Sequence, residues 1–172
     1  GELLDDVIDN VFYGVTWAGT DYLFYTRVDD AWRSDSVWRH KVGTPASEDV
    51  RVFHEEDERF NVGVGSSRSK RFLIIESSSK VTSESWVLEL DNPTGEFRVV
   101  RPREHNVEYS VSHAVLLGRD AWLIVHNAHG PNFELGWMWT TDTLGSFDNL
   151  RVLVPHRDTV RIEGVHAYEH QP

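Results

Sequence analysis

Cysteine is absent from this sequence of 172 residues. The chain therefore has no disulfide framework and no thiolate chemistry, which is consistent with a reducing compartment. Its apolar stretches all fall short of the roughly 18 residues of a membrane span, and no signal peptide opens the sequence. We expect a cytoplasmic chain with no membrane partner.

Positive charge is scarce, with 17 lysines and arginines against 28 aspartates and glutamates and a net charge of −11. This balance argues against nucleic acid as a partner, because its phosphates demand a basic surface. The acidic balance is compatible with basic peptides as partners. The alternative is an acidic surface that only keeps the chain soluble.

Motifs for nucleophilic catalysis are also missing. A nucleophile elbow needs Gly-x-Ser-x-Gly ahead of a helix. The nearest stretch, Gly63-Val64-Gly65-Ser66-Ser67, has neither the pattern nor the helix and predicts a hairpin turn. We expect no catalytic residue in this chain.

Metal-ligand patterns are incomplete. His54 is followed by four acidic residues but by no second histidine four positions on, so residues 54–58 predict a solvated acidic turn and not a zinc-peptidase helix. His126 and His129 lie three positions apart across a turn and could meet a metal only with ligands from elsewhere. We predict no metal and no cofactor.

The sequence does contain an internal repeat that occurs four times with a period of roughly 50 residues, which is typical of a β-propeller. Three strand types recur. The first is marked by Gly-Val or Ser-Val pairs at 14–15, 63–64, 110–111 and 164–165, the second by apolar runs at 22–25, 72–75 and 122–125, and the third by an arginine within branched residues at 50–53, 97–100 and 150–153.

The repeat predicts an all-β chain with three four-stranded blades. We place the blades at 11–59, 60–106 and 107–159, after an outer strand of a preceding blade in 1–10 and before the inner strand of a next blade in 160–172. Strands are expected at 11–16, 22–27, 36–42, 50–55, 61–65, 72–77, 85–90, 97–101, 108–113, 122–127, 132–139, 150–154 and 161–168. A propeller closes with four to eight blades, so this arc should be open.

Several phrases resemble the propeller domain of the prolyl oligopeptidase family of serine peptidases, in particular its oligopeptidase B (protease II) branch. They include Tyr25-Thr26-Arg27-Val28-Asp29 and the stretches 37–44, 57–65, 71–75, 80–84, 95–100, 107–111, 132–135 and 160–165. They follow in order over nearly the whole chain. The resemblance implies a seven-bladed propeller, of which this chain is a middle stretch.

The resemblance also implies an indirect function. In this family a hydrolase domain carries the catalytic Ser, Asp and His, and the propeller covers that site so that only short peptides reach it. The oligopeptidase B branch favours cleavage after Lys or Arg. The expected partners are therefore a peptide substrate and a hydrolase domain of the same polypeptide, and this chain alone should be inactive.

The inner strands are the parts expected to face passing substrate or the hydrolase domain. They carry the candidate residues Tyr13, Glu108, Tyr109, His113, Glu163 and His166. Glu108 and Glu163 could attract basic peptides. The alternative is that these residues only pack the central layer of the propeller.

Two other functions remain open at this point: a propeller that binds peptides or proteins on its faces, and a purely structural array. Truncated blades leave unpaired edges. We therefore expect the isolated chain to self-associate, through residues 2–4 and 161–168.

Overall fold

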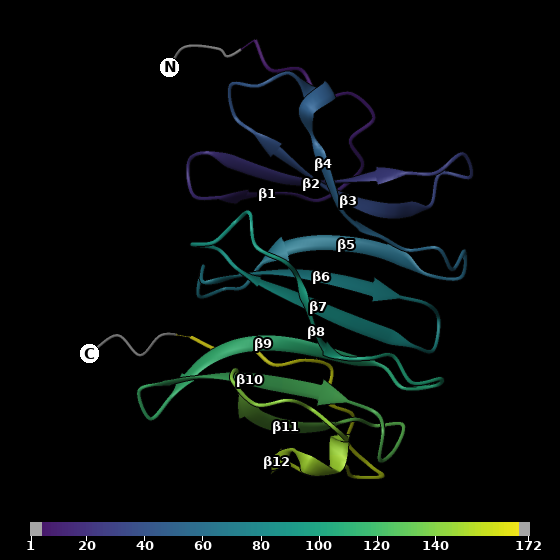
Figure 1. The fold of residues 1–172 in the computed structure, drawn as a ribbon. Helices are drawn as coiled ribbons and strands as arrows, with labels where there is room; N and C mark the ends of the chain where they lie inside the picture. The colour runs from purple at the N-terminus through teal and green to yellow at the C-terminus, as the bar shows by residue number, and fades with distance from the viewer. Residues whose placement is uncertain (1–4, 169–172) are drawn as a thin grey trace.

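The structure is a computed structural model that describes residues 5–168. Twelve β-strands form three antiparallel sheets of four strands each. The sheets are stacked one on another in chain order, from β1–β4 to β9–β12 (Figure 1). The described residues contain no α-helix and thus no helix able to cross a membrane. The predicted all-β fold of three four-stranded blades in an open arc is confirmed.

Each sheet is a meander whose strand order follows the chain. The first sheet holds β1 (Val15–Ala18), β2 (Tyr22–Val28), β3 (Ser34–Lys41) and β4 (Val50–His54). The second holds β5 (Asn61–Ser66), β6 (Phe72–Ser78), β7 (Ser83–Glu89) and β8 (Arg98–Arg101). The third holds β9 (Tyr109–Leu116), β10 (Arg119–His126), β11 (Glu134–Trp139) and β12 (Arg151–Val154). Short 3-10 turns, η1 (Ala46–Glu48) and η2 (Phe147–Asn149), precede β4 and β12.

The continuous apolar runs mark strands that are buried on both faces, as predicted. Because side chains alternate along a strand, β6 sends Leu73 and Ile75 into the core shared with the first sheet. Its Phe72 and Ile74 join the core shared with the third sheet, where Trp122 is fully buried. The middle sheet therefore belongs to two cores at once.

The first predicted strand, 11–16, is corrected to β1 at Val15–Ala18. The backbone N–H of Phe12 still donates to the Thr26 carbonyl at 2.9 Å, so the chain already runs beside β2 before β1 begins. Gly14 then takes a positive φ of 98°, a conformation that interrupts a regular ladder. The glycine that marked the strand in the sequence is in fact the break before it.

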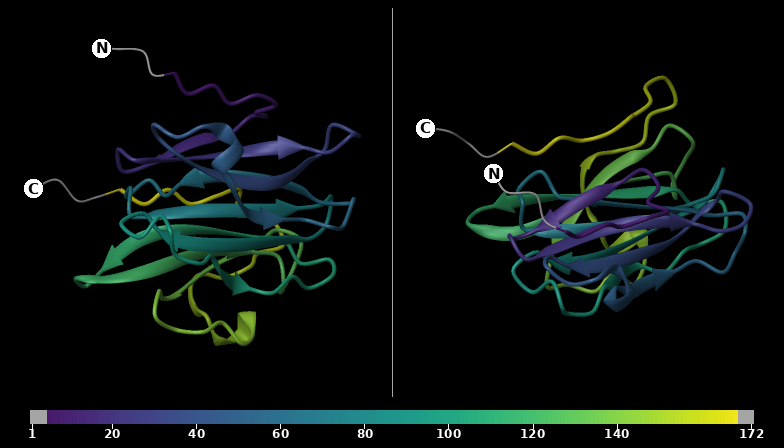
Figure 2. Two further views of the ribbon diagram at one scale, coloured as in Figure 1. Left: turned by 45° about the horizontal axis from the view of Figure 1, so that its top comes forward. Right: turned by 90° about the horizontal axis from the view of Figure 1, so that it is seen from above.

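The strand predicted at 161–168 is also corrected, because these residues lie in no strand. Isolated contacts hold them, among them three hydrogen bonds: the Ile162 N–H donates to the Asn132 carbonyl at 2.9 Å, the Arg161 guanidinium donates to the Pro131 carbonyl at 3.1 Å, and the Ser112 hydroxyl donates to the Val165 carbonyl at 3.4 Å. Figure 2 shows the segment running beside the sheets. A strand needs a ladder with a partner, and this segment has none. Its assignment to a next blade stays a prediction, and the strand expected in residues 1–10 falls partly outside the described residues.

Candidate functional site

The inner edge of the stack is formed by β1, β5 and β9, the first strand of each sheet. Small residues follow β5 along this edge. A Cβ added at Gly63 or at Gly65 would meet no atom within 4 Å, so both glycines face open space. The edge can therefore admit another molecule close to the backbone.

A groove of about 440 Å³ opens beside this edge, between the second and third sheets. Its walls bring together three of the predicted site residues, Glu108, Tyr109 and Glu163. Serine hydroxyls and the exposed guanidinium of Arg161 complete a largely polar lining. The remaining predicted residues, Tyr13, His113 and His166, lie outside this groove.

Glu108 is held in place at the groove by Asn127. The Glu108 N–H donates to the Asn127 side-chain oxygen at 2.8 Å, and the Asn127 amide donates to Glu108 Oε2 at 3.2 Å. Glu163 also lines the groove and is exposed. The two carboxylates outnumber the Arg161 guanidinium in the groove, so its lining is net negative and favours a cationic guest, such as a basic side chain of a peptide.

Tyr109 serves the fold more than the groove. Its hydroxyl accepts the N–H groups of Ser85 and Arg101 at 2.9 and 3.2 Å, and it donates to the Arg101 carbonyl at 2.5 Å. Burial raises its pKa to about 12, so it stays neutral. The side chain ties β7 and β8 to β9, and its hydroxyl is fully engaged.

His113 is buried between the second and third sheets, against Phe72 and Trp122. Its Nδ1 lies 2.8 Å from the Ser69 hydroxyl, and its Nε2 lies 3.2 Å from Asp120 Oδ1. Burial lowers the pKa of His113 although Asp120 opposes the shift.

The Ser69–His113–Asp120 chain has the composition of a serine-hydrolase triad but not its geometry. In such triads Nε2 faces the hydroxyl and Nδ1 faces the carboxylate, and here the two are exchanged. The Asp120 carboxylate is also paired with the Arg71 guanidinium. We interpret these hydrogen bonds as a structural link between the β5–β6 hairpin and the third sheet.

Tyr13 and His166 are exposed. Tyr13 is 85% exposed, and its ring packs edge to face on that of its neighbour Phe12, with ring centroids 5.0 Å apart. His166 belongs to the segment after β12 that lies in no strand. Both are free to contact another domain, and neither is placed beside Glu108.

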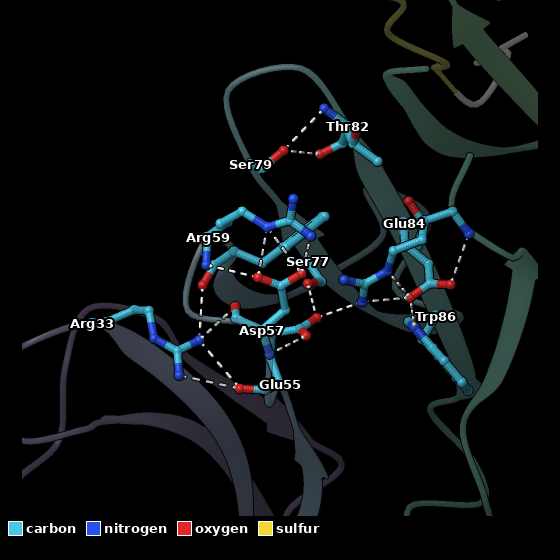
Figure 3. Close-up of polar contacts among 12 residues, drawn as sticks. Arg33, Glu55, Asp57, Arg59, Ser77, Ser79, Thr82, Glu84 and Trp86 are labelled. Atoms are coloured by element: carbon cyan, nitrogen blue, oxygen red, sulfur yellow. Dashed lines mark hydrogen bonds and ion pairs between the residues drawn. The ribbon is translucent and has the colours of Figure 1, made fainter. Parts of the chain in front are cut away.

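The sequence did not point to a charged network that crosses from the first sheet to the second (Figure 3). Glu55, directly after β4, is only 5% exposed. Its carboxylate accepts from the Ser77 hydroxyl at 2.6 Å and from the Arg103 guanidinium at 2.5 Å. Arg103 also contacts Glu84 Oε2 at 2.9 Å. Burial raises the pKa of Glu55, but Arg103 and Ser77 outweigh it and hold that pKa below its usual value.

The β4–β5 linker is fixed from the other side by Arg33. Its guanidinium donates to the carbonyls of Glu55, Asp57 and Phe60 at 3.0–3.2 Å. The predicted solvated acidic turn is thus right for Glu56 and Glu58, which are exposed, and wrong for the buried Glu55. Arg103 lies 48 positions from Glu55, and no local pattern in the sequence connects them.

Three metal-type side chains converge in the third sheet. The ligand atoms of His126, His129 and Glu134 all lie within 4.8 Å of one another. The sequence had linked the two histidines but not the glutamate, which begins the next strand.

Three stacked four-stranded meanders with an open inner edge define the fold class of this chain. It is an arc of a β-propeller. The family described as the prolyl oligopeptidase N-terminal β-propeller domain matches residues 1–171, and the chain belongs to it.

Relatives support this membership. The chain is 38% identical to dipeptidyl aminopeptidase BI of Pseudoxanthomonas mexicana over 98% of its own length, and 37% identical to protease 2 of Moraxella lacunata over 78%. It matches the structure of oligopeptidase B from Trypanosoma brucei, closed and with covalently bound antipain, with a TM-score of 0.80 at 33% identity over 91% of this chain. The chain spans 23%, 19% and 22% of the lengths of these three proteins.

Proposed function

We propose that this chain is the non-catalytic cover of a serine oligopeptidase and restricts its active site to short peptides. The observation that carries the proposal is the family match over residues 1–171. A relative named as a peptidase is aligned with nearly the whole chain, which fills only 23% of that relative. The remaining length leaves room for the hydrolase domain that would carry the triad.

The proposed substrates are short peptides that are cleaved after Lys or Arg. Glu108 and Glu163 in one groove, together with the net charge of −11, support a preference for cationic peptides. The proposed location is the cytoplasm, on the ground that the sequence has no cysteine. The open inner edge beside β5 supports the passage of a peptide backbone.

The size filter is tested on the complete natural polypeptide. Its kcat/KM is measured for arginine-containing peptides of increasing length and for a folded protein with exposed arginines. We expect kcat/KM to fall steeply with length and the folded protein to resist cleavage. Equal turnover of all substrates would contradict the filter.

The charge preference is tested by substituting both groove carboxylates, Glu108→Gln with Glu163→Gln. We expect kcat/KM for lysine and arginine peptides to fall several-fold at low salt and the difference to shrink as salt is added. Glu96→Gln, an exposed carboxylate on the β7–β8 loop, is the matched control and should change little. An equal fall in kcat/KM for the control variant would show that the groove carboxylates do not determine the preference for cationic peptides.

The alternative is a binding module that associates with other chains, including copies of itself. Large apolar side chains exposed on the first and third sheets favour it: Val15, Trp17, Val152 and Leu153 are 49–56% exposed. Light scattering on the isolated chain at micromolar concentrations tests self-association. A dimer or larger species is expected, and a clean monomer at every concentration would contradict it.

A further inference from the structure

The β10–β11 hairpin gathers two imidazoles and a carboxylate at one point. His126 ends β10, His129 lies in the connecting turn, and Glu134 begins β11. The Glu134 Oε1 atom lies 3.1 Å from His129 Nδ1 and 3.6 Å from His126 Nε2. The two imidazole rings stand nearly perpendicular, with centroids 5.3 Å apart. All three ligand atoms thus surround one small volume.

The environment of the His126 side chain indicates a bound ligand. The side chain has no exposed surface, and neither ring nitrogen has a hydrogen-bond partner among residues 5–168. Buried polar groups are nearly always paired, so an orphaned imidazole this deep indicates a missing partner.

The surroundings of the other two side chains resemble the outer shell of a metal site. The second ring nitrogen of His129, Nε2, lies 2.9 Å from Asp148 Oδ1. Metal-bound histidines commonly donate their other N–H to such a carboxylate, which fixes the ring and its tautomer. Glu134 keeps Oε1 toward the histidines while Oε2 accepts the His156 N–H at 3.4 Å. The ligand atoms of His129 and Glu134 are therefore each oriented by a contact on the far side of the same side chain.

We propose that this hairpin binds one divalent transition-metal ion, preferably Zn²⁺, through His126 Nε2, His129 Nδ1 and Glu134 Oε1. Two nitrogens and one oxygen form a ligand set that suits zinc, whereas Ca²⁺ and Mg²⁺ prefer oxygen alone. Three protein ligands leave a fourth tetrahedral position for water. The His129 side chain is 35% exposed, so water can reach the site from its side.

Binding would fasten the hairpin to η2, since Asp148 belongs to that turn and Phe147 stacks on His126. The competing account is a metal-free cluster in which a His129 imidazolium bridges Glu134 and Asp148. The metal site and the metal-free cluster involve the same side chains. They differ in whether a metal ion or the proton of the His129 imidazolium lies between them.

The test uses the whole chain, stripped with a chelator and then titrated calorimetrically with Zn²⁺. We expect one ion per chain, and with Co²⁺ as a probe we expect the visible absorption of a four-coordinate nitrogen–oxygen site. His129→Gln and Glu134→Gln should each weaken binding at least tenfold. Circular dichroism of His129→Gln, a half-exposed position, verifies that the fold is retained.

The matched control is His54→Gln. The His54 side chain is also 35% exposed and also faces a carboxylate, with Nε2 3.3 Å from Asp35 Oδ2, but it belongs to no cluster of three metal-type groups within the described residues. Its substitution should leave Zn²⁺ binding unchanged. No binding by the wild-type chain, or binding that survives His129→Gln unaltered, would overturn the proposal in favour of the metal-free cluster.

Discussion

The two interfaces between neighbouring sheets are sealed by different chemistry. Both contain an apolar core, but the interface between the first and second sheets ends in a network of charges around Glu55 and Arg103. The interface between the second and third sheets is closed mainly by aromatic rings around Trp122 and by Tyr109 and His113. The Arg71–Asp120 ion pair also crosses it, but its two side chains are more exposed, at 53% and 28%, than the carboxylates of the first network.

The difference shows what each interface can tolerate. Buried charges are stable only while every partner is present, so the first interface should be sensitive to the loss of a single cation. The second depends on close packing, so it should be sensitive to the loss of volume. The two interfaces should also respond differently to salt and to pH.

The largest effect is expected at the second interface, from Trp122→Ala. The ring is fully buried, and its centroid lies 4.8 Å from that of Phe72. The substitution removes a large buried ring and leaves a cavity, which costs about 3 to 5 kcal/mol of unfolding free energy. Urea denaturation of the wild type and of Trp122→Ala measures this loss of unfolding free energy. A loss below about 1 kcal/mol would show that this core is not what joins the sheets.

At the first interface, Arg103→Leu removes the cation that faces Glu55 and Glu84. Both carboxylates are less than a tenth exposed, whereas the Arg103 side chain is 31% exposed and partly screened. We expect a loss of about 2 to 3 kcal/mol in urea denaturation. Adding Glu55→Gln to this variant should restore part of the loss, because one unpaired charge is then removed.

The matched control for that change is Arg59→Leu. Arg59 also pairs with a carboxylate, Asp57, at 2.6 Å, but its side chain is 75% exposed. Exposed ion pairs contribute little to the free energy of unfolding because water and salt screen them, so the loss for the control should lie well below that for Arg103→Leu. Equal losses for the two arginines would break the distinction between a buried and a solvated network.

The pH response of the second interface should follow His113. Its pKa lies below the ordinary value because burial disfavours the imidazolium; Asp120 opposes this shift and Arg71 adds to it. As the pH falls below about 6.5, the unfolded chain gains a proton that the folded chain refuses, so stability declines until the folded pKa is passed. Denaturation of the wild type and of His113→Gln between pH 4 and 8 should show a shallower decline in the variant.

A buried histidine of the first sheet should respond in the opposite direction. His40 lies 2.7 Å from Asp49 and 3.3 Å from Asp6, which outweigh burial and raise its pKa. Its contribution is present in full below about pH 6.5 and is lost as the pH rises through the raised pKa. His40→Gln should therefore destabilise the chain at pH 6 more than at pH 9. The same sign for both histidines would contradict the assigned environments.

The smallest expected effect is that of Ser69→Ala on peptide hydrolysis by the isolated chain. Because Ser69 and His113 lack the geometry of a triad, wild-type chain and Ser69→Ala should both leave arginine and lysine peptide reporters uncleaved. Turnover that a serine-directed inhibitor blocks, and that Ser69→Ala abolishes, would make the interface an active site.

The sequence predicted the periodic part of the molecule well. Apolar runs such as 72–75 and 122–125 located buried strands because their alternation and spacing are local properties. Residues 161–168 form no strand, because a strand requires a partner and the described residues supply no ladder for them. Their place in a next blade stays a prediction.

The site was less predictable, because it depends on contacts between distant positions. Tyr109 and His113 were expected to face passing substrate or the hydrolase domain. The structure buries both side chains between sheets, although Tyr109 also lines the groove. Glu55 was taken for a solvated residue because its partner Arg103 is 48 positions away. No composition or spacing rule could supply these pairings.

The central claim, that the chain covers the active site of a serine oligopeptidase, is tested most directly by determining the full length and downstream sequence of the natural polypeptide. The account predicts a polypeptide several-fold longer that reaches a Gly-x-Ser-x-Gly turn followed by Asp and His. A natural polypeptide that stops near Pro172 would contradict it and leave the self-associating binding module as the function.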